Sequence, residues 1–354
     1  MRHSVRGLSG LLCLLLLCTG CGGGAVSSAP GSGSVAATAA VTKPVERELF
    51  AMDTYMNLRV WGEEAPAALE AAEREIHRLD ELLSVTGENS EIRRANAGET
   101  VTLSEETAAL LEQALRLSEE TGGAFDITIY PLMEAWGFPS GDYRVLSVRE
   151  RKKLLAKVGQ KHIHYDRKKK TLCLDKGTRI DLGGIAKGCL ADRLKELMRE
   201  LKVPAAMLSL GSSTIQLAGE KPDGTPWKVA IRDPEDENAF AGILSGPACV
   251  IDTSGGYERF FKRDGKTYWH ILDPATGAPA ESGLLSVTVV GGDGTEGDGL
   301  ATALFVMGEK RALEYWRARS EDFDLVLVRE DGTIAVTEGI GDRFTSERAV
   351  DIVD

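Results

Sequence analysis

The chain is short of cysteine, of basic residues and of long apolar runs. Beyond residue 21 its cysteines are Cys173, Cys189 and Cys249, with no C-x-x-C pair or Cys/His cluster. This scatter argues against a disulfide framework and a cysteine zinc site, and it predicts buried free thiols. Acidic residues outnumber basic ones by 54 to 42, which gives a formal net charge of −12. Such a charge argues against nucleic acid as a partner.

A long apolar run stands only near the amino end. Leu8–Leu17 follows the basic residues Arg2 and Arg6. The run is too short to span a bilayer as a stable helix, so residues 1–20 read as a targeting segment.

The residues after this run are similar to a bacterial lipobox. In Leu17-Cys18-Thr19-Gly20-Cys21 a small residue precedes Cys21, although Cys18 stands where leucine is usual. The match predicts a lipoprotein signal peptide over 1–20 and a lipid on Cys21. An ordinary secretory peptide is the alternative.

A stretch rich in Gly, Ser, Ala and Thr separates this cysteine from the rest of the chain. It contains no acidic residue between Gly22 and Pro44. That composition is typical of a flexible tether, here residues 21–44 with the lipidated Cys21. We expect residues 45–354 to form the folded domain, held at a bacterial cell membrane and facing outside the cytoplasm.

Helical and strand patterns do not alternate regularly in this domain. Such irregular order fits an α+β fold better than a doubly wound parallel sheet. Helical spacing and capping residues predict helices over 66–83, 104–120, 147–159, 185–201, 297–307 and 310–320. Strand patterns fall at 162–166, 171–174, 206–210, 215–218, 227–231, 267–272, 284–290, 325–328 and 334–336.

The octet Asp181-Leu-Gly-Gly-Ile-Ala-Lys-Gly188 joins an apolar segment to one of these helices. Lys187 falls in the first helical turn, where a cation opposes the helix dipole. An anion held there by free N–H groups and the ammonium would explain that placement. The octet therefore indicates a site for a phosphorylated ligand. The alternative is a helix start with packing glycines and a solvated lysine.

Two further segments carry groups suited to a nucleotide. Gly122–Leu132 places Phe125 and Asp126 on a loop after a helix end, where an aromatic beside backbone amides suits a flat heterocycle. Asp298 and Thr302 lie four residues apart, so that they share one helix face and offer oxygen ligands to a hard divalent cation. A packing cluster and an ordinary helix start are the respective alternatives.

One histidine has a setting suited to proton transfer. The chain has five histidines, and His270 ends a predicted strand just before Asp273-Pro274. A histidine at such a strand end can act as a general base. A hydrogen-bonded structural histidine is the alternative.

Together these segments resemble the ApbE family, the FAD:protein FMN transferases (flavin transferases). The resemblance covers nearly all of residues 47–340, with the matching segments in the family's order. They are Phe50–Thr54, Ala124–Phe138, Asp181–Gly188, Thr253–Arg259, Tyr268–Pro279 and Ser286–Met307.

The resemblance implies an ApbE-like, T-fold-like α+β fold with mixed, largely antiparallel sheets flanked by helices. It implies a magnesium-dependent transfer of FMN from FAD to a threonine hydroxyl of an acceptor protein, with AMP released. His270 would deprotonate the acceptor, and Lys187 and Asp298 would complete the catalytic set. The nucleotide contacts would be Met52, Ala124, Phe125, Asp126, Asp181, Lys187 and Ile271. The magnesium site would involve Gly184, Ala186, Asp298, Ala301 and Thr302.

The chain departs from the family pattern in three places. Gly211-Ser212-Ser213 stands where family members usually have a glycine pair and an Asn or Asp. Cys189 stands where an aromatic residue is common, and Gly299 where alanine is common. Two other functions stay open at this stage: hydrolysis of FAD to FMN and AMP, and FAD binding without catalysis. The anchor and tether suggest acceptors such as subunits of membrane redox pumps or extracellular reductases.

Overall fold

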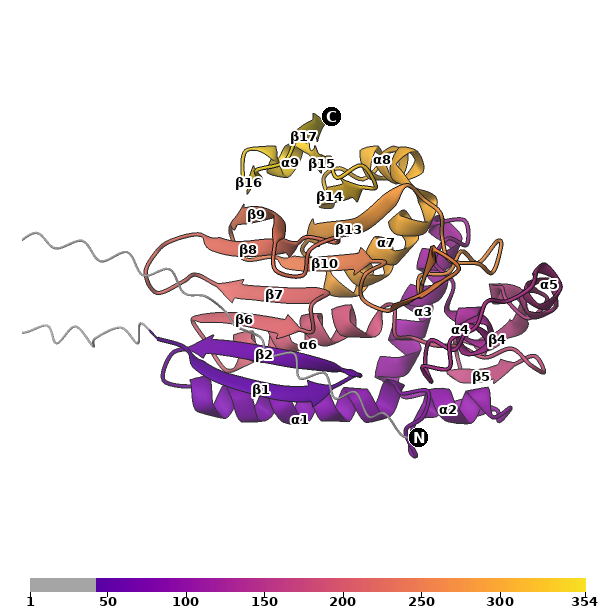
Figure 1. The fold of residues 1–354 in the computed structure, drawn as a ribbon. Helices are drawn as coiled ribbons and strands as arrows, with labels where there is room; N and C mark the ends of the chain where they lie inside the picture. The colour runs from indigo at the N-terminus through magenta and orange to yellow at the C-terminus, as the bar shows by residue number, and fades with distance from the viewer. Residues whose placement is uncertain (1–42) are drawn as a thin grey trace, which may run out of the picture. The chain divides into compact units, whose positions relative to one another are not determined.

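One large sheet organises the part of the chain that the structure describes. The computed structural model describes residues 43–354, so the predicted signal peptide, Cys21 and nearly all of the tether lie outside the described residues. The sheet has nine strands, all antiparallel to their neighbours except β15 and β17 (Figure 1). In sheet order they are β1 (Val45–Ala51), β2 (Thr54–Trp61), β6 (Ala205–Leu210), β7 (Thr214–Gly219), β10 (Val250–Gly255), β13 (Leu284–Gly291), β14 (Phe323–Arg329), β15 (Ile334–Thr337) and β17 (Val350–Val353).

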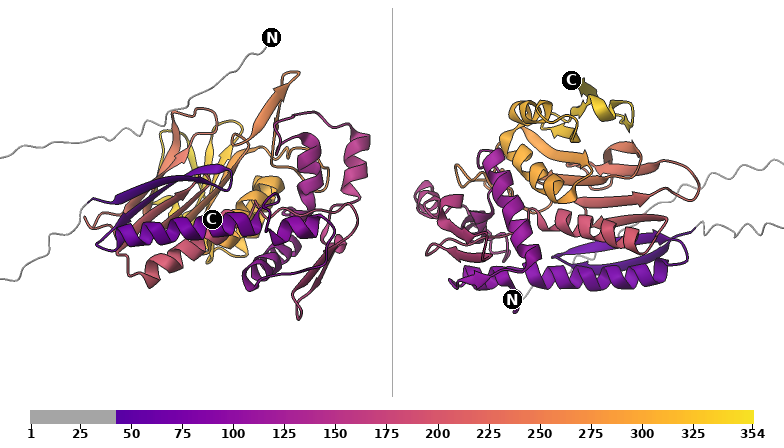
Figure 2. Two further views of the ribbon diagram at one scale, coloured as in Figure 1. Left: turned by 90° about the horizontal axis from the view of Figure 1, so that it is seen from below. Right: turned by 180° about the vertical axis from the view of Figure 1, so that it is seen from behind.

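Helices cover one face of this sheet. In Figure 2, α1 and α6 run along the strands, and α1 contacts β1 and β2 while α6 contacts β7. α7 packs on β10 and β13 and crosses α6. These contacts enclose the largest core, which includes Leu208, Val250 and Val289. The helices are α1 (Ala65–Leu83), α2 (Glu91–Asn96), α3 (Glu105–Glu120), α4 (Tyr130–Trp136), α5 (Val148–Leu155), α6 (Ala186–Glu200), α7 (Gly294–Met307), α8 (Glu309–Arg317) and α9 (Glu338–Gly341).

A second core lies on the opposite face of the sheet. Because side chains alternate along a strand, Ile251 points away from the helices while Val250 and Asp252 point toward them. Ile251 joins a separate buried cluster with Val229 and Leu244. These come from a small sheet of β16 (Phe344–Thr345), β9 (Phe240–Gly246) and β8 (Trp227–Arg232).

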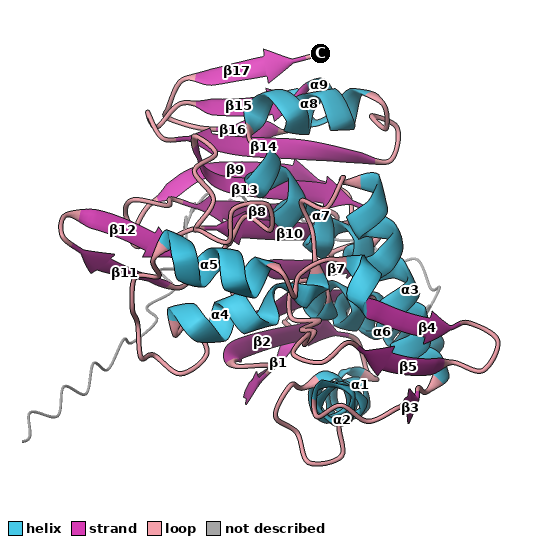
Figure 3. Cartoon of the chain, turned by 90° about the vertical axis from the view of Figure 1, so that its right-hand side faces the viewer, coloured by secondary structure: helices cyan, strands magenta, loops and turns pink. Residues whose placement is uncertain are grey.

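A third cluster joins α4 and α5 to a projecting hairpin. β11 (Phe260–Arg263) and β12 (Lys266–Trp269) form this hairpin, which lies beside α4 and α5 in Figure 3. Trp136 and Phe138 pack there with Phe261. The remaining small sheet consists of β3 (Val101–Thr102), β5 (Thr171–Leu174) and β4 (Ile163–Asp166). Two short 3-10 helices complete the described elements: η1 (Ile127–Ile129) directly precedes α4, and η2 (Gln160–His162) directly precedes β4.

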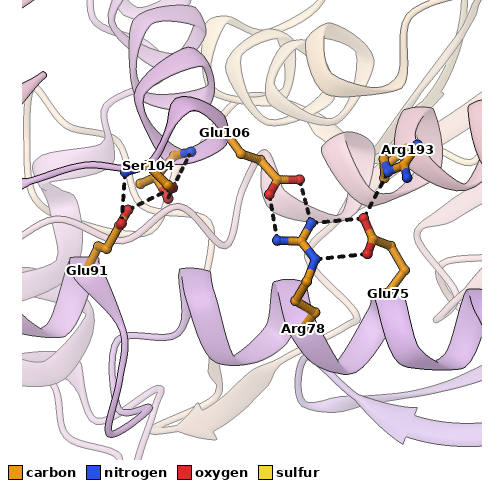
Figure 4. Close-up of polar contacts among 7 residues, drawn as sticks. Glu75, Arg78, Glu91, Ser104, Glu106 and Arg193 are labelled. Atoms are coloured by element: carbon orange, nitrogen blue, oxygen red, sulfur yellow. Dashed lines mark hydrogen bonds and ion pairs between the residues drawn. The ribbon is translucent and has the colours of Figure 1, made fainter.

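Ion pairs tie the helices α1, α3 and α6 together. Figure 4 shows Arg78 of α1 between Glu75 of the same helix and Glu106 of α3, and Arg193 of α6 also reaches Glu75. The hydrogen bond from Arg78 and the weaker one from Arg193 lower the pKa of Glu75 to about 2. This network holds α6, and hence its first turn, against α1 and α3.

The predicted α+β class is confirmed, and most predicted elements are found. The helix predicted from residue 297 begins at Gly294, where Asp293 caps it through the Glu296 N–H. The helix expected to close near Gly159 ends at Leu155, and the strand expected over 267–272 ends at Trp269. Among the described residues no helix is long and apolar enough to cross a membrane. Cys173, Cys189 and Cys249 are free as predicted, but they are half-buried.

Candidate active site

The octet Asp181–Gly188 forms the turn into α6. Asp181 Oδ1 accepts a hydrogen bond of 2.8 Å from the Gly183 N–H, and the helix begins at Ala186. Neither a side-chain cap nor an acidic residue occupies its first turn. Lys187 makes no ion pair within residues 43–354. The helix start therefore keeps a free cation and its dipole, as an anion site requires.

The acid of α7 lies directly against this helix start. Asp298 Oδ2 accepts a hydrogen bond of 3.0 Å from the Gly188 N–H. The backbones of α6 and α7 come so close here that a Cβ on Gly188 would lie 1.9 Å from the Gly294 carbonyl oxygen. Two segments that are about a hundred residues apart in sequence thus meet through their backbones.

The other predicted metal-site residues gather around the same point. Thr302 Oγ1 lies 4.0 Å from where a Gly184 Cβ would stand, and 3.0 Å from Ser254 Oγ. Ala186 opens α6 beside them. Ala301 is fully buried in the core, and its methyl group offers no oxygen to an ion. Asp298 and Thr302 supply the side-chain oxygens here, which is a donor set that suits magnesium.

The predicted nucleotide contacts from Ala124 to Asp126 border this turn. The Asp181 N–H donates to the Ile127 carbonyl over 2.9 Å, so that the two loops are in contact. Asp126 Oδ1 accepts from the N–H and hydroxyl of Thr128, and burial raises the pKa of Asp126. Burial also raises the pKa of Asp181, against the opposing charge of Lys187.

Phe125 is largely buried beside the turn at Gly184. The side chain is only 4% exposed. Its Cε2 atom would lie 3.3 Å from a Cβ on Gly184. The ring therefore packs against the turn, and its contact with the nucleotide stays a prediction.

Met52 lies in a strained hairpin turn. Met52 and Asp53 join β1 to β2 with φ values of 47° and 60°. Such a turn prefers glycine or asparagine, and a side chain like methionine adopts it at a cost. Asp53 Oδ2 pairs with Arg259 Nη2 at 2.8 Å, which links this turn to the loop after β10. Arg259 was not predicted as a site residue, although it follows the Thr253–Gly256 turn.

His270 follows β12 and is held by its backbone. Its N–H donates to the Arg259 carbonyl over 3.0 Å, and its ring packs edge-on against Phe138. The ring Nδ1 is buried without a hydrogen-bond partner in the described chain. Burial, and then the charges of Arg259 and Lys187, lower the pKa of His270 to about 4. The imidazole is neutral at pH 7, as a proton acceptor must be. Ile271, next in sequence, is buried in the core.

This lowered pKa predicts a pH-dependent stability. Between pH 6.5 and 4 the unfolded chain protonates His270 while the native chain does not, so that stability falls as the pH falls through this window. From pH 7.5 to pH 5, the wild-type chain should lose about 2 kcal/mol more than His270→Gln. Urea unfolding at the two pH values checks this difference. Equal losses in both chains would contradict the assignment.

Asp252 is a buried acid that the sequence analysis passed over. It is fully buried on β10, and Thr214 donates to its Oδ1 over 2.8 Å. Burial and the neighbouring Asp298 raise the pKa of Asp252 well above its usual range. A charged residue directly after the apolar pair Val250-Ile251, and two positions before Ser254, was the available signal.

The glycines of the helix crossing predict a stability contrast. A Cβ on Gly188 would strike the rigid Gly294 carbonyl, so Gly188→Ala should destabilise the fold by about 3 kcal/mol or more. A Cβ on Gly299 would lie 2.3 Å from Leu117 Cδ2, the movable end of a side chain. Gly299→Ala should therefore cost only about 1 kcal/mol, after its gain in helix propensity. Urea unfolding of both variants tests this order, and equal costs would contradict it.

The structure places Asp181, Gly184, Phe125, Asp298 and Thr302 around the start of α6. The hollows of about 410 and 620 Å³ found elsewhere, beside Arg319 and Lys310, are lined by none of these residues. No group of three or more His, Cys, Asp or Glu able to hold a metal occurs within residues 43–354. An ion at this site would therefore rely on hydroxyl, main-chain and ligand oxygens beside its carboxylates.

The fold and the site define an α+β protein with a lysine in the first turn of a helix, an oxygen donor pair beside it and a neutral histidine. The chain belongs to the ApbE family, whose model matches residues 52–327. It is 30% identical over 293 residues to the FAD:protein FMN transferase of Escherichia coli, covering 79% of this chain and 83% of that protein. It is 32% identical over 294 residues to the Salmonella typhimurium transferase, with the same coverage.

Solved structures show the same architecture. The ApbE protein of Thermotoga maritima superimposes with a TM-score of 0.80 at 32% identity, over 85% of this chain and 99% of that one. The apo form of the Pseudomonas stutzeri flavinyl transferase ApbE superimposes with a TM-score of 0.74 at 28% identity, over 85% of this chain and 98% of that one.

Proposed function

We propose that this protein transfers FMN from FAD to a threonine hydroxyl of an acceptor protein and releases AMP. The observation that carries the proposal is the meeting of Asp298 with the start of α6. It sets the oxygen pair of Asp298 and Thr302 and the ammonium of Lys187 around the first turn of α6. The relatives named FAD:protein FMN transferase support the substrate and the acceptor class.

Magnesium fits this site by the chemistry of its donors. Asp298 and Thr302 would hold the ion with the main chain at Gly184 and Ala186, and a Cβ on Gly184 would lie 4.0 Å from Thr302 Oγ1. When bound, the ion would offset the negative charge of the FAD diphosphate. Lys187 adds a positive charge from the protein itself, which stabilises the leaving AMP.

His270 supplies the proton acceptor. It removes the proton from the threonine hydroxyl, and the hydroxyl oxygen attacks the FMN phosphorus. The bond from that phosphorus to the bridging oxygen then breaks, and the bridging oxygen leaves with AMP. The unpartnered Nδ1 and the neutral state of the ring are consistent with this role.

Incubation of the full-length chain with FAD, magnesium and an acceptor carrying a flavinylated threonine tests this proposal. Transfer gives an acceptor whose mass rises by one FMN. Free FMN with an unmodified acceptor would show hydrolysis instead. Retained FAD without turnover would show a binding protein, and either of these results would overturn the proposal.

We also propose that a lipid on Cys21 anchors the protein to a bacterial membrane, facing outside the cytoplasm. The lipobox-like segment and the tether support this, and redox-pump subunits or extracellular reductases would be acceptors within reach. Cys21→Ala should move the protein from the membrane fraction to the soluble or secreted fraction. A variant that still pellets with membranes would contradict the anchor.

A further inference from the structure

Asp252 has one carboxylate oxygen without a partner. Its side chain is fully buried, and Thr214 on the neighbouring strand β7 occupies only Oδ1. Oδ2 is buried and accepts no hydrogen bond in residues 43–354. A buried carboxylate oxygen left in this way is costly unless a proton or a cation satisfies it.

This oxygen points toward the first turns of α7. A Cβ on Gly297 would lie 2.5 Å from Asp252 Oδ2, so the glycine leaves room for the carboxylate. The next residue is Asp298, whose charge acts on Asp252. Two acids, one from the strand and one from the helix, therefore face the same space.

The position of Asp252 on its strand continues the site already described. Asp252 and Ser254 lie two residues apart, so they point to the same side of the sheet. Ser254 Oγ is 3.0 Å from Thr302 Oγ1, which makes this side the one that faces the oxygen donors. Lys187 is the cation whose charge acts on Asp252, and it lies at the start of α6.

We infer that Asp252 is a second acidic group of the divalent-cation site, supplied by β10 opposite Asp298. This inference rests on the proposed function, because it assigns a residue to the ion of that reaction. A hard divalent cation prefers carboxylate oxygens, and its affinity rises with the number of charged groups around it. Asp252 thereby supplies a carboxylate from the strand, whereas the side chain of Ala301 on α7 offers no oxygen.

Binding of Mn²⁺ alone, followed by electron paramagnetic resonance of the free ion, tests this role in the full-length chain in detergent. Asp252→Asn keeps the bond from Thr214 and removes the charge. It should weaken Mn²⁺ binding about tenfold or more. Asp324→Asn is the matched control, because Asp324 also accepts from a threonine (2.7 Å) and abuts a helix glycine, Gly339. Asp324 lies two residues before Val326, so it points to the opposite face of the sheet from the site. The control should bind Mn²⁺ like the wild type.

Thermal unfolding separates this role from a structural one. In EDTA, Asp252→Asn should unfold at a temperature no lower than the wild type, because it removes an unpartnered buried carboxylate. Saturating Mn²⁺ should then raise the unfolding temperature of the wild type more than that of the variant. Unchanged Mn²⁺ affinity in Asp252→Asn would overturn the inference while leaving the proposed function standing. A wild type that binds no Mn²⁺ would overturn both the ion site and the role of Asp252.

Discussion

Replacing Asp298 by alanine is expected to lower the rate of flavinylation by at least about 100-fold. The change removes the acid that faces the start of α6, and with it the charged side-chain ligand of the proposed ion. It also removes the hydrogen bond to the Gly188 N–H. Acceptor flavinylation measured by mass over a magnesium titration gives the rate and its metal dependence.

Asp298→Asn separates the two consequences. Its amide oxygen can still accept from Gly188, so the stability should stay close to that of the wild type, whereas alanine should cost about 1 kcal/mol. Both variants should lose activity because both lose the charge. Glu296→Gln, which changes another acid of α7 that pairs with Arg319, should retain the wild-type rate. Full activity in Asp298→Asn would show that the carboxylate charge is not needed.

Replacing His270 by glutamine should lower kcat by about 100- to 10,000-fold, with little effect on the KM for FAD. Glutamine fills a similar space and keeps the backbone bond to Arg259, but it cannot take the proton from a threonine. The loss should therefore appear in the chemical step alone. Single-turnover transfer from pre-bound FAD measures that step directly.

His164→Gln is the matched control for this experiment. His164 is exposed on β4 and bonds Asp175 at 2.8 Å, on a sheet separate from the one that carries the site. It should transfer FMN at the wild-type rate. If His270→Gln did the same, the acceptor proton would have to leave by another route, and the role given to His270 would be wrong.

The sequence predicted the helices around the site better than the hairpin beside it. Ser104 and the Ser147–Glu150 capping box marked helix starts that the structure reproduces. The β1–β2 hairpin was missed because its turn is Met52-Asp53, without the glycine or asparagine that usually signals such a turn. Local patterns report local preferences, and this turn adopts a conformation that its own residues disfavour.

The site residues were predicted as separate segments of the sequence. That these segments lie close together in space could not be predicted. Nothing local to Gly188 or Asp298 shows that the two hydrogen bond across about a hundred residues. Asp252 was missed for the same reason, since the place of its carboxylate beside α7 depends on the absence of a side chain at Gly297. The burial of Phe125 was not predicted, because an aromatic on a loop has the same sequence pattern whether its ring is exposed or packed.

The contact between Gly188 and Gly294 divides the site into a fixed half and an adjustable half. Backbone meets backbone there, so no side chain at the crossing can change its rotamer and alter the spacing of α6 and α7. The other half is carried by the β1–β2 turn and by the loops around Arg259 and His270, which are joined to one another by a surface ion pair and a main-chain bond. We therefore expect differences in the shape of acceptor proteins to be accommodated on the hairpin side, and the crossing of α6 with α7 to stay constant from one acceptor to the next.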